Sequence, residues 1–459
     1  MGSGSLESGL APSQATPATA CPNGSLRGMQ TPLRHATPRG SIFPAALDSS
    51  RMLAPGSRAY VVLLGALTAL TALSVDMSLP ALPRLTEVFT TTPDKAQLTL
   101  SVFLIGFAVG QLAYGPISDR FGRRPVLLFG LVVYTLGGIG CALAGSIDQL
   151  VLFRLLQGLG GCVGRVMGPA IVRDEFHAQQ GAQVLSYVTL VMALAPLIAP
   201  MIGGYLLVVA DWQAIFIALA AFGVIVLAVI ATRFGESSKH RDPQATQIPT
   251  LLRNYVRFLA HRTCLGYALI NCFVFAGLFC YISGSSFVFI EVFGLPSHIY
   301  GILFGVTAVA FMTGAVLNGR LVRRRAPQMI LRVGLAIVLT GGGAMLLAAL
   351  ISPSMAGVLV PIVLYVFGMA FVFPNATAAA MEPMPRMAGV ASSLLGSSQM
   401  ATGSLAGYLV NRFYDRTPLA MAAGIAVAAF LACLTYLLLI HRGGAGRGRA
   451  APPSVPPAR

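Results

Sequence analysis

Three ionisable side chains lie inside apolar segments of this chain, where they could carry charge or protons across a membrane. Asp76 falls within the first apolar segment, and Arg154 and Arg165 share the fourth. Placing an ionisable group in a bilayer costs roughly 2.5–3.5 kcal/mol on insertion scales. Each of the three therefore needs a specific role, either in chemistry or in structure.

Asp76 is the only acid well inside an apolar segment, whereas Glu291 lies near the outer end of the seventh. Burial favours the neutral form of a carboxyl group, and a nearby cation favours the charged form. Approach or withdrawal of a cation could therefore load and release a proton at Asp76. In a second interpretation Asp76 is structural and bonds to the hydroxyl of Ser74 or Ser78.

Arg154 and Arg165 are spaced to lie on one side of a helix. Eleven residues separate them, which corresponds to a rotation of about 20°, so both could face a central cavity. Gln157 follows Arg154 by three residues and shares its helical face. Arg154 could instead extend to the membrane interface. For Arg165, binding of an anionic group, an ion pair with Asp76 and a structural pairing are all open.

Composition excludes an ordinary soluble protein. Of 459 residues, 56% are hydrophobic and only 10% are charged, too few to cover a soluble surface. The net charge of +16 comes from basic residues scattered between apolar segments, which indicates membrane topology and not nucleic-acid binding. The seven cysteines form no C-x-x-C pair, and there is no phosphate-binding loop. We expect neither a metal, a cofactor nor enzymatic activity.

Apolar periodicity predicts an all-α membrane protein with twelve spans in two six-helix halves. Each segment is long enough to cross a hydrocarbon core of roughly 30 Å. The spans are placed at 59–81, 97–117, 125–145, 151–172, 184–207, 213–233, 264–288, 299–319, 329–350, 356–378, 388–411 and 418–440. The implied regions are a disordered tail 1–58, a first bundle 59–233, a linker 234–263, a second bundle 264–440 and a disordered tail 441–459.

The distribution of basic residues predicts that both termini and the linker are cytoplasmic. This orientation puts 25 Lys and Arg on the cytoplasmic side and only Arg84, Lys95, Arg412 and Arg416 on the other. An internal repeat supports the division into halves. Gly110, Gly115 and Arg120 recur as Gly314, Gly319 and Arg324 at a constant offset, although Asp119 corresponds to Arg323. Parallel duplication of six helices is a recurrent transporter architecture.

The segment Gly110–Pro125, GQLAYGPISDRFGRRP, predicts a short charged hinge between the second and third spans. The chain is expected to leave the membrane at Gly115-Pro116. Asp119 could cap a helix or pair with a neighbouring arginine or with the cluster Arg173-Asp174-Glu175. We expect these charges to form a latch that biases one conformation. Its residues are Gly115, Asp119, Arg120, Gly122, Arg123, Arg124 and Asp174.

Several motifs resemble those of the major facilitator superfamily over about residues 59–440. GPISDRFGRRP resembles its hinge motif, RLLQGLGG (Arg154–Gly161) its fourth-helix motif, and APLIAPMIGGY (Ala195–Tyr205) its fifth-helix antiporter motif, with Ala199 where Gly is usual. SVDMSLPALP and PRMAGVASSLLGS are similar to segments of the Bcr/CflA (bicyclomycin and chloramphenicol resistance) branch of drug:proton antiporters.

This resemblance implies a monomeric antibiotic exporter of the bacterial inner membrane, with a small-molecule drug and protons as partners. It implies that Arg154 faces the cavity and couples to protons, and that Pro196, Pro200, Gly203 and Gly204 belong to an exporter motif. A proton-coupled uptake carrier for a metabolite or anion is the alternative, and a non-transporting receptor is a third possibility. Some aromatic residues of the seventh span could line a drug cavity, while we expect most to face lipid or to pack between helices: Phe273, Phe275, Phe279, Tyr281, Phe287 and Phe289.

Overall fold

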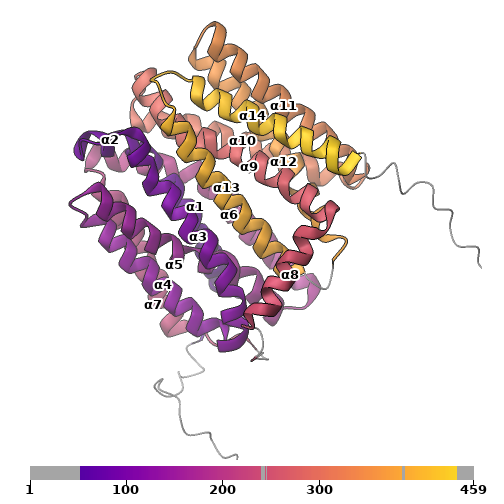
Figure 1. Ribbon diagram of the computed structural model, residues 1–459. Coiled ribbons are helices and arrows are strands. Elements are labelled where there is room, and N and C mark those ends of the chain that lie inside the picture. Colours follow the sequence, from indigo (N-terminus) through magenta and orange to yellow (C-terminus); the bar gives the residue numbers. More distant parts are fainter. Residues whose placement is uncertain (1–51, 239–242, 244–245, 385–387, 442–459) are drawn as a thin grey trace, which may run out of the picture. The chain divides into compact units, whose positions relative to one another are not determined.

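The computed structural model describes residues 52–238, 243, 246–384 and 388–441, and every regular element in this part of the chain is a helix (Figure 1). The first half contains α1 (Arg58–Asp76), α2 (Leu82–Val88), α3 (Pro93–Phe121), α4 (Arg123–Ala142), α5 (Ile147–Glu175), α6 (Ala178–Val209) and α7 (Gln213–Arg233). A short helix, α8 (Ile248–Ala260), follows. The second half contains α9 (Arg262–Ser286), α10 (Ser297–Leu321), α11 (Pro327–Ile351), α12 (Met355–Met381), α13 (Ala388–Arg412) and α14 (Leu419–Thr435).

The predicted twelve-span architecture is confirmed, although α13 differs from the other long helices in composition. Within the described residues, eleven helices are apolar and long enough to cross a membrane, while α13 has suitable length but a more polar sequence. Its polar residues include buried Ser397, Gln399 and Ser404. Because α13 packs against both α3 and α9, these side chains meet protein and not lipid, which is where polar residues in spans are tolerated.

At the hinge, the second spanning helix extends further than the sequence predicted. Helix α3 does not end at Gly115-Pro116 but continues to Phe121, with Pro116 inside it. Pro116 lacks the N–H that would donate to the Leu112 carbonyl, and spanning helices tolerate proline in their interior. The chain turns only at Gly122, whose φ of +102° favours glycine.

The linker and the tails also differ in part from the sequence expectation. The linker contains α8, a helix in which Leu252 and Val256 are exposed. Each is followed in the sequence by an exposed arginine, Arg253 and Arg257. At the N-terminus, α1 begins at Arg58, and the predicted tail up to residue 51 lies outside the described residues. The predicted C-terminal tail lies outside them from residue 442 onward.

The two halves repeat one packing pattern. In the first half α3 packs on α5 and α4 packs on both α5 and α7, while in the second half α10 packs on α12 and α11 packs on both α12 and α14. Glycines at equivalent positions mediate these contacts. Gly137 lies against the backbone of Gln157, and Gly341, 204 residues later, lies against the backbone of Tyr365. The repeat therefore extends beyond the hinge motif and defines how each bundle packs.

Contacts between the halves involve α6 with α10 and α3 with α13. Near the end of the bundle opposite the hinge, a Cβ on Gly204 would lie 2.5 Å from the Ser297 carbonyl oxygen, so the two backbones touch there. The Gln97 amide donates to the Ser283 hydroxyl at 2.7 Å near the same end. Further along, the Ser101 and Ser404 hydroxyls each donate to the other's carbonyl. The halves are thus closed against each other at this end.

Candidate functional site

A cavity lies between the two halves and is lined by six helices. One face of α1 contributes Thr68, Thr71, Ala72, Val75 and Asp76, a spacing of three and four residues that keeps side chains on one side of a helix. The other lining residues are Leu104, Arg165, Met192, Phe279, Ile282 and Met400. Its volume is about 140 Å³, below the roughly 300–1,000 Å³ typical of ligand pockets. In this conformation the cavity is too small for a drug-sized ligand.

Asp76 is the acid of this cavity. It is the last residue of α1, only 5% exposed, and forms no ion pair or hydrogen bond with any described residue. The alternative that Ser74 or Ser78 bonds to its carboxylate is not supported. The Ser74 hydroxyl contacts the Leu70 carbonyl and Tyr134, and the Ser78 hydroxyl donates to backbone carbonyls. A buried carboxyl group without a protein partner is a functional candidate.

Arg154 does not line the cavity, which contradicts the expectation from the family resemblance. Its side chain is completely buried, and its guanidinium lies 4.4 Å from the ring centre of Phe103. It donates to the Thr99 carbonyl at 3.2 Å, to the Ser74 carbonyl at 3.1 Å and to the Gln157 side chain at 2.8 Å. Gln157 lies on the same helical face as Arg154, as its spacing predicted, and the two side chains bond there. Arg154 thereby joins α1, α3 and α5 through neutral acceptors.

Arg165 does line the cavity, as its helical position predicted. It forms no ion pair with Asp76, and no hydrogen bond joins it to any residue that the structure describes. Glu291 lies elsewhere, in the π-helical turn Phe287–Val292 after α9, where its carboxylate accepts a hydrogen bond from Tyr414 at 3.3 Å. Of the aromatic residues in the seventh span, Phe279 lines the cavity.

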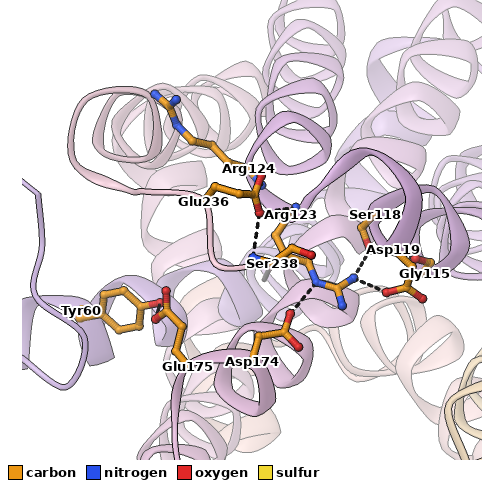
Figure 2. Close-up of polar contacts among 10 residues, drawn as sticks. All are labelled: Tyr60, Gly115, Ser118, Asp119, Arg123, Arg124, Asp174, Glu175, Glu236 and Ser238. Carbon is orange, nitrogen blue, oxygen red and sulfur yellow. Dashed lines mark hydrogen bonds and ion pairs between the residues drawn. The ribbon is translucent and has the colours of Figure 1, made fainter. Parts of the chain in front are cut away.

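The hinge forms a connected set of charges within the first half (Figure 2). Arg123, only 5% exposed, pairs with Asp119 at 2.6 Å and with Asp174 at 2.9 Å. Asp174 lies in the last turn of α5 and not in a loop, since α5 continues to Glu175. Glu175 in turn accepts a hydrogen bond from the Tyr60 hydroxyl of α1. The charges therefore join α3, α4 and α5, with α1 attached through Glu175.

Sequence reasoning missed Glu236, which binds the start of α4. Its carboxylate accepts hydrogen bonds from the backbone N–H groups of Arg123 at 2.8 Å and Arg124 at 3.3 Å (Figure 2). Negative charge at a helix N-terminus is stabilising, and Gly122 has no side chain to provide it. The Arg124 guanidinium donates to the Ala231 carbonyl near the end of α7, and Arg120 donates to Thr246 of the linker. Hydrogen bonds thus connect the hinge to the segment that joins the halves.

The segment with the antiporter-like sequence forms the contact between the halves. Pro196 and Pro200 lie inside α6, where each removes a backbone donor. A Cβ on Gly203 would lie 2.1 Å from the Met77 carbonyl of the first half, whereas Gly204 meets α10 of the second. Adjacent glycines thus let α6 approach both halves closely.

Comparison with known proteins places this fold and sequence in one family. Residues 64–407 match the model of the Major Facilitator Superfamily. The chain is 32% identical to a bicyclomycin resistance protein homolog of Haemophilus influenzae, over 85% of this chain and 98% of that protein. It is 28% identical to a chloramphenicol resistance protein of Pseudomonas aeruginosa, over 73% of this chain and 80% of that protein.

A solved structure supports the same fold. The xylose transporter XylE from E. coli, in a partially occluded inward-open conformation, matches with a TM-score of 0.65, 16% sequence identity, and coverage of 83% of this chain and 97% of that chain. At this identity the similarity concerns the fold alone.

Proposed function

Because the chain belongs to the major facilitator superfamily and resembles its bicyclomycin and chloramphenicol resistance members, we propose that this multi-pass membrane transporter is a secondary active exporter of antibiotics. It exchanges a proton for an amphipathic small molecule by alternating access, in the bacterial inner membrane, as a monomer with both termini in the cytoplasm. The observation that carries the proposal is Asp76, an acid that has no ion pair or hydrogen bond with a described residue and that lies in a cavity formed by both halves.

The cavity has the composition that such an exchange requires. Its apolar side chains, including Met192, Phe279 and Met400, suit the hydrophobic part of a ligand. Asp76 provides one site that a proton can occupy and leave. When the halves rock, the same acid would face each side of the membrane in turn.

The energetics of this exchange are sufficient without ATP. One proton moving down about 100 mV and one pH unit supplies roughly 2.3 plus 1.4 kcal/mol. For a neutral molecule exchanged one for one, this supports a concentration gradient of several hundredfold.

The hinge would bias the two conformations. Its charges contact the first half and the linker, while the closed contacts Gly204–Ser297 and Gln97–Ser283 lie near the other end. We propose that Asp119, Arg123 and Asp174 act as a latch when the cytoplasmic side closes, and that Glu236 connects this latch to the linker.

Chloramphenicol accumulation in cells tests the direction and the energy source. Cells that overproduce the protein are expected to accumulate several-fold less chloramphenicol than cells that produce Asp76→Asn, because export is powered by the proton gradient. A protonophore should abolish this difference. Greater accumulation in the overproducing cells, reversed by the protonophore, would instead identify an uptake carrier.

A further inference from the structure

Resting on the proposed exporter function, we propose that Arg165 is the binding subsite for an anionic group of the transported molecule. The site would take small amphipathic organic anions, such as aryl carboxylates. Arg165 projects from α5 into the cavity between the halves, and no described residue neutralises its charge.

The position of Arg165 along the bundle follows from the glycines beside it. A Cβ on Gly164 would lie 1.9 Å from the Leu67 carbonyl oxygen, and one on Gly168 would lie 3.0 Å from the Thr68 methyl carbon. Helices α1 and α5 therefore touch at this level, and Arg165 sits beside Leu67 and Thr68.

Asp76 lies at a different level of the same cavity. It follows Thr68 by eight residues on α1, a separation of about 12 Å along a helix axis. The two opposite charges thus line one cavity without pairing. A bound molecule can place an anion at Arg165 while Asp76 remains available to a proton.

The surroundings of Arg165 favour an amphipathic ligand over a free inorganic ion. Leu104, Met192 and Phe279 provide apolar surface in the same cavity. The Thr71 hydroxyl, also in its lining, is buried without a hydrogen-bond partner among the described residues. An arginine inside a span is costly, and a guanidinium recognises carboxylate oxygens through paired, charge-assisted hydrogen bonds. In an aryl carboxylate, the carboxylate can pair with the guanidinium while the ring contacts the apolar side chains.

Two ligands of nearly the same shape, one anionic and one neutral, provide the test. The probes are naphthalene-2-carboxylate and naphthalene-2-carboxamide, whose two rings suit a cavity of about 140 Å³. Their affinities are measured at pH 7 by equilibrium binding to the purified full-length protein. We expect wild type to bind the carboxylate at least tenfold more tightly than the amide, as charge-assisted hydrogen bonds would give.

Three variants separate the charge from the packing. Arg165→Gln should reduce the carboxylate-to-amide affinity ratio to about one by weakening the carboxylate alone, and Arg165→Lys should restore part of the preference. Arg320→Gln, which removes an exposed arginine at the end of α10, should keep the wild-type ratio. Amide binding by Arg165→Gln shows that the variant is folded.

The proposal is overturned if wild type shows no preference for the carboxylate, or if Arg165→Gln retains the preference. It is also overturned if Arg320→Gln loses the preference to the same extent. This assay involves no proton gradient, so its failure is distinct from a failure of the proposed export. Chloramphenicol export without carboxylate preference rejects the subsite alone, and carboxylate preference without chloramphenicol export rejects the exporter alone.

Discussion

Asp76→Asn is expected to abolish uphill transport of chloramphenicol in vesicles with an imposed pH gradient, at least a tenfold loss. The amide resembles the protonated acid in size but cannot release a proton, so the coupled half of the cycle stops. Asp76 has no hydrogen bond to a described residue, and the substitution therefore breaks no observed contact. Gradient-independent exchange of chloramphenicol across the membrane is expected to survive, because it requires no net change in protonation.

Glu291→Gln is the matched control for this prediction. Glu291 bonds to Tyr414 near the end of the bundle opposite the hinge and does not line the cavity, so its variant should retain gradient-driven transport. Normal accumulation by Asp76→Asn together with loss in Glu291→Gln would move the proton site to Glu291.

Arg123→Ala is expected to destabilise the protein and to slow turnover more than it weakens substrate binding. The substitution leaves the carboxylates of Asp119 and Asp174 together without their shared cation. Removing one partner of a buried ion pair typically costs 3–5 kcal/mol. Since Asp119 is 46% exposed, water screens part of this loss, and we expect about 2–3 kcal/mol. Thermal unfolding, equilibrium binding and transport rate measure the three effects.

Two further variants isolate the latch. Arg120→Ala removes a neighbouring arginine whose side chain donates to Thr246 of the linker and pairs with no described carboxylate, and it should have a much smaller effect. Adding Asp174→Asn to Arg123→Ala should recover part of the stability by removing one uncompensated charge. The latch is rejected if Arg123→Ala loses substrate binding while its balance between conformations equals that of wild type.

The sequence was sufficient to predict the twelve-span fold, because hydropathy and span length are properties of each segment alone. It was less successful at the end of α3, where the second span was placed at 97–117 and the chain was expected to leave the membrane at Gly115-Pro116, although the helix continues to Phe121. The helix ends instead before Gly122, where the backbone takes a positive φ. Rules that end a helix at proline or glycine, applied to the local sequence, do not decide which of these residues ends α3.

The candidate site was predicted in part. Asp76 was selected as the only acid well inside a span, and helical spacing indicated that Arg165 could face a central cavity; both residues line the cavity. The same spacing favoured Arg154, yet this arginine is buried among carbonyls of Ser74 and Thr99. Those acceptors come from α1 and α3. Whether Arg154 faces the cavity or is buried between helices therefore depends on how α1, α3 and α5 pack. Residue spacing within α5 does not contain that information.

Glu236 illustrates what sequence reasoning missed at the hinge. The N–H groups at the start of α4 require an acceptor, and Gly122 cannot supply one. The acceptor comes from a residue more than a hundred positions later, beyond α7. The sequence shows that Gly122 offers no side-chain acceptor to these N–H groups, but their partner Glu236 could be found only from the tertiary structure.

Proton release on substrate binding tests the central claim, which is that Asp76 exchanges its proton for the transported molecule. Chloramphenicol is added to purified protein in weakly buffered solution at several pH values between about 5.5 and 8.5, and the released protons are counted with a pH indicator. Wild type is expected to release up to one proton per bound molecule in part of this range, and Asp76→Asn to bind chloramphenicol without release. Equal proton release by Asp76→Asn and wild type would contradict the account.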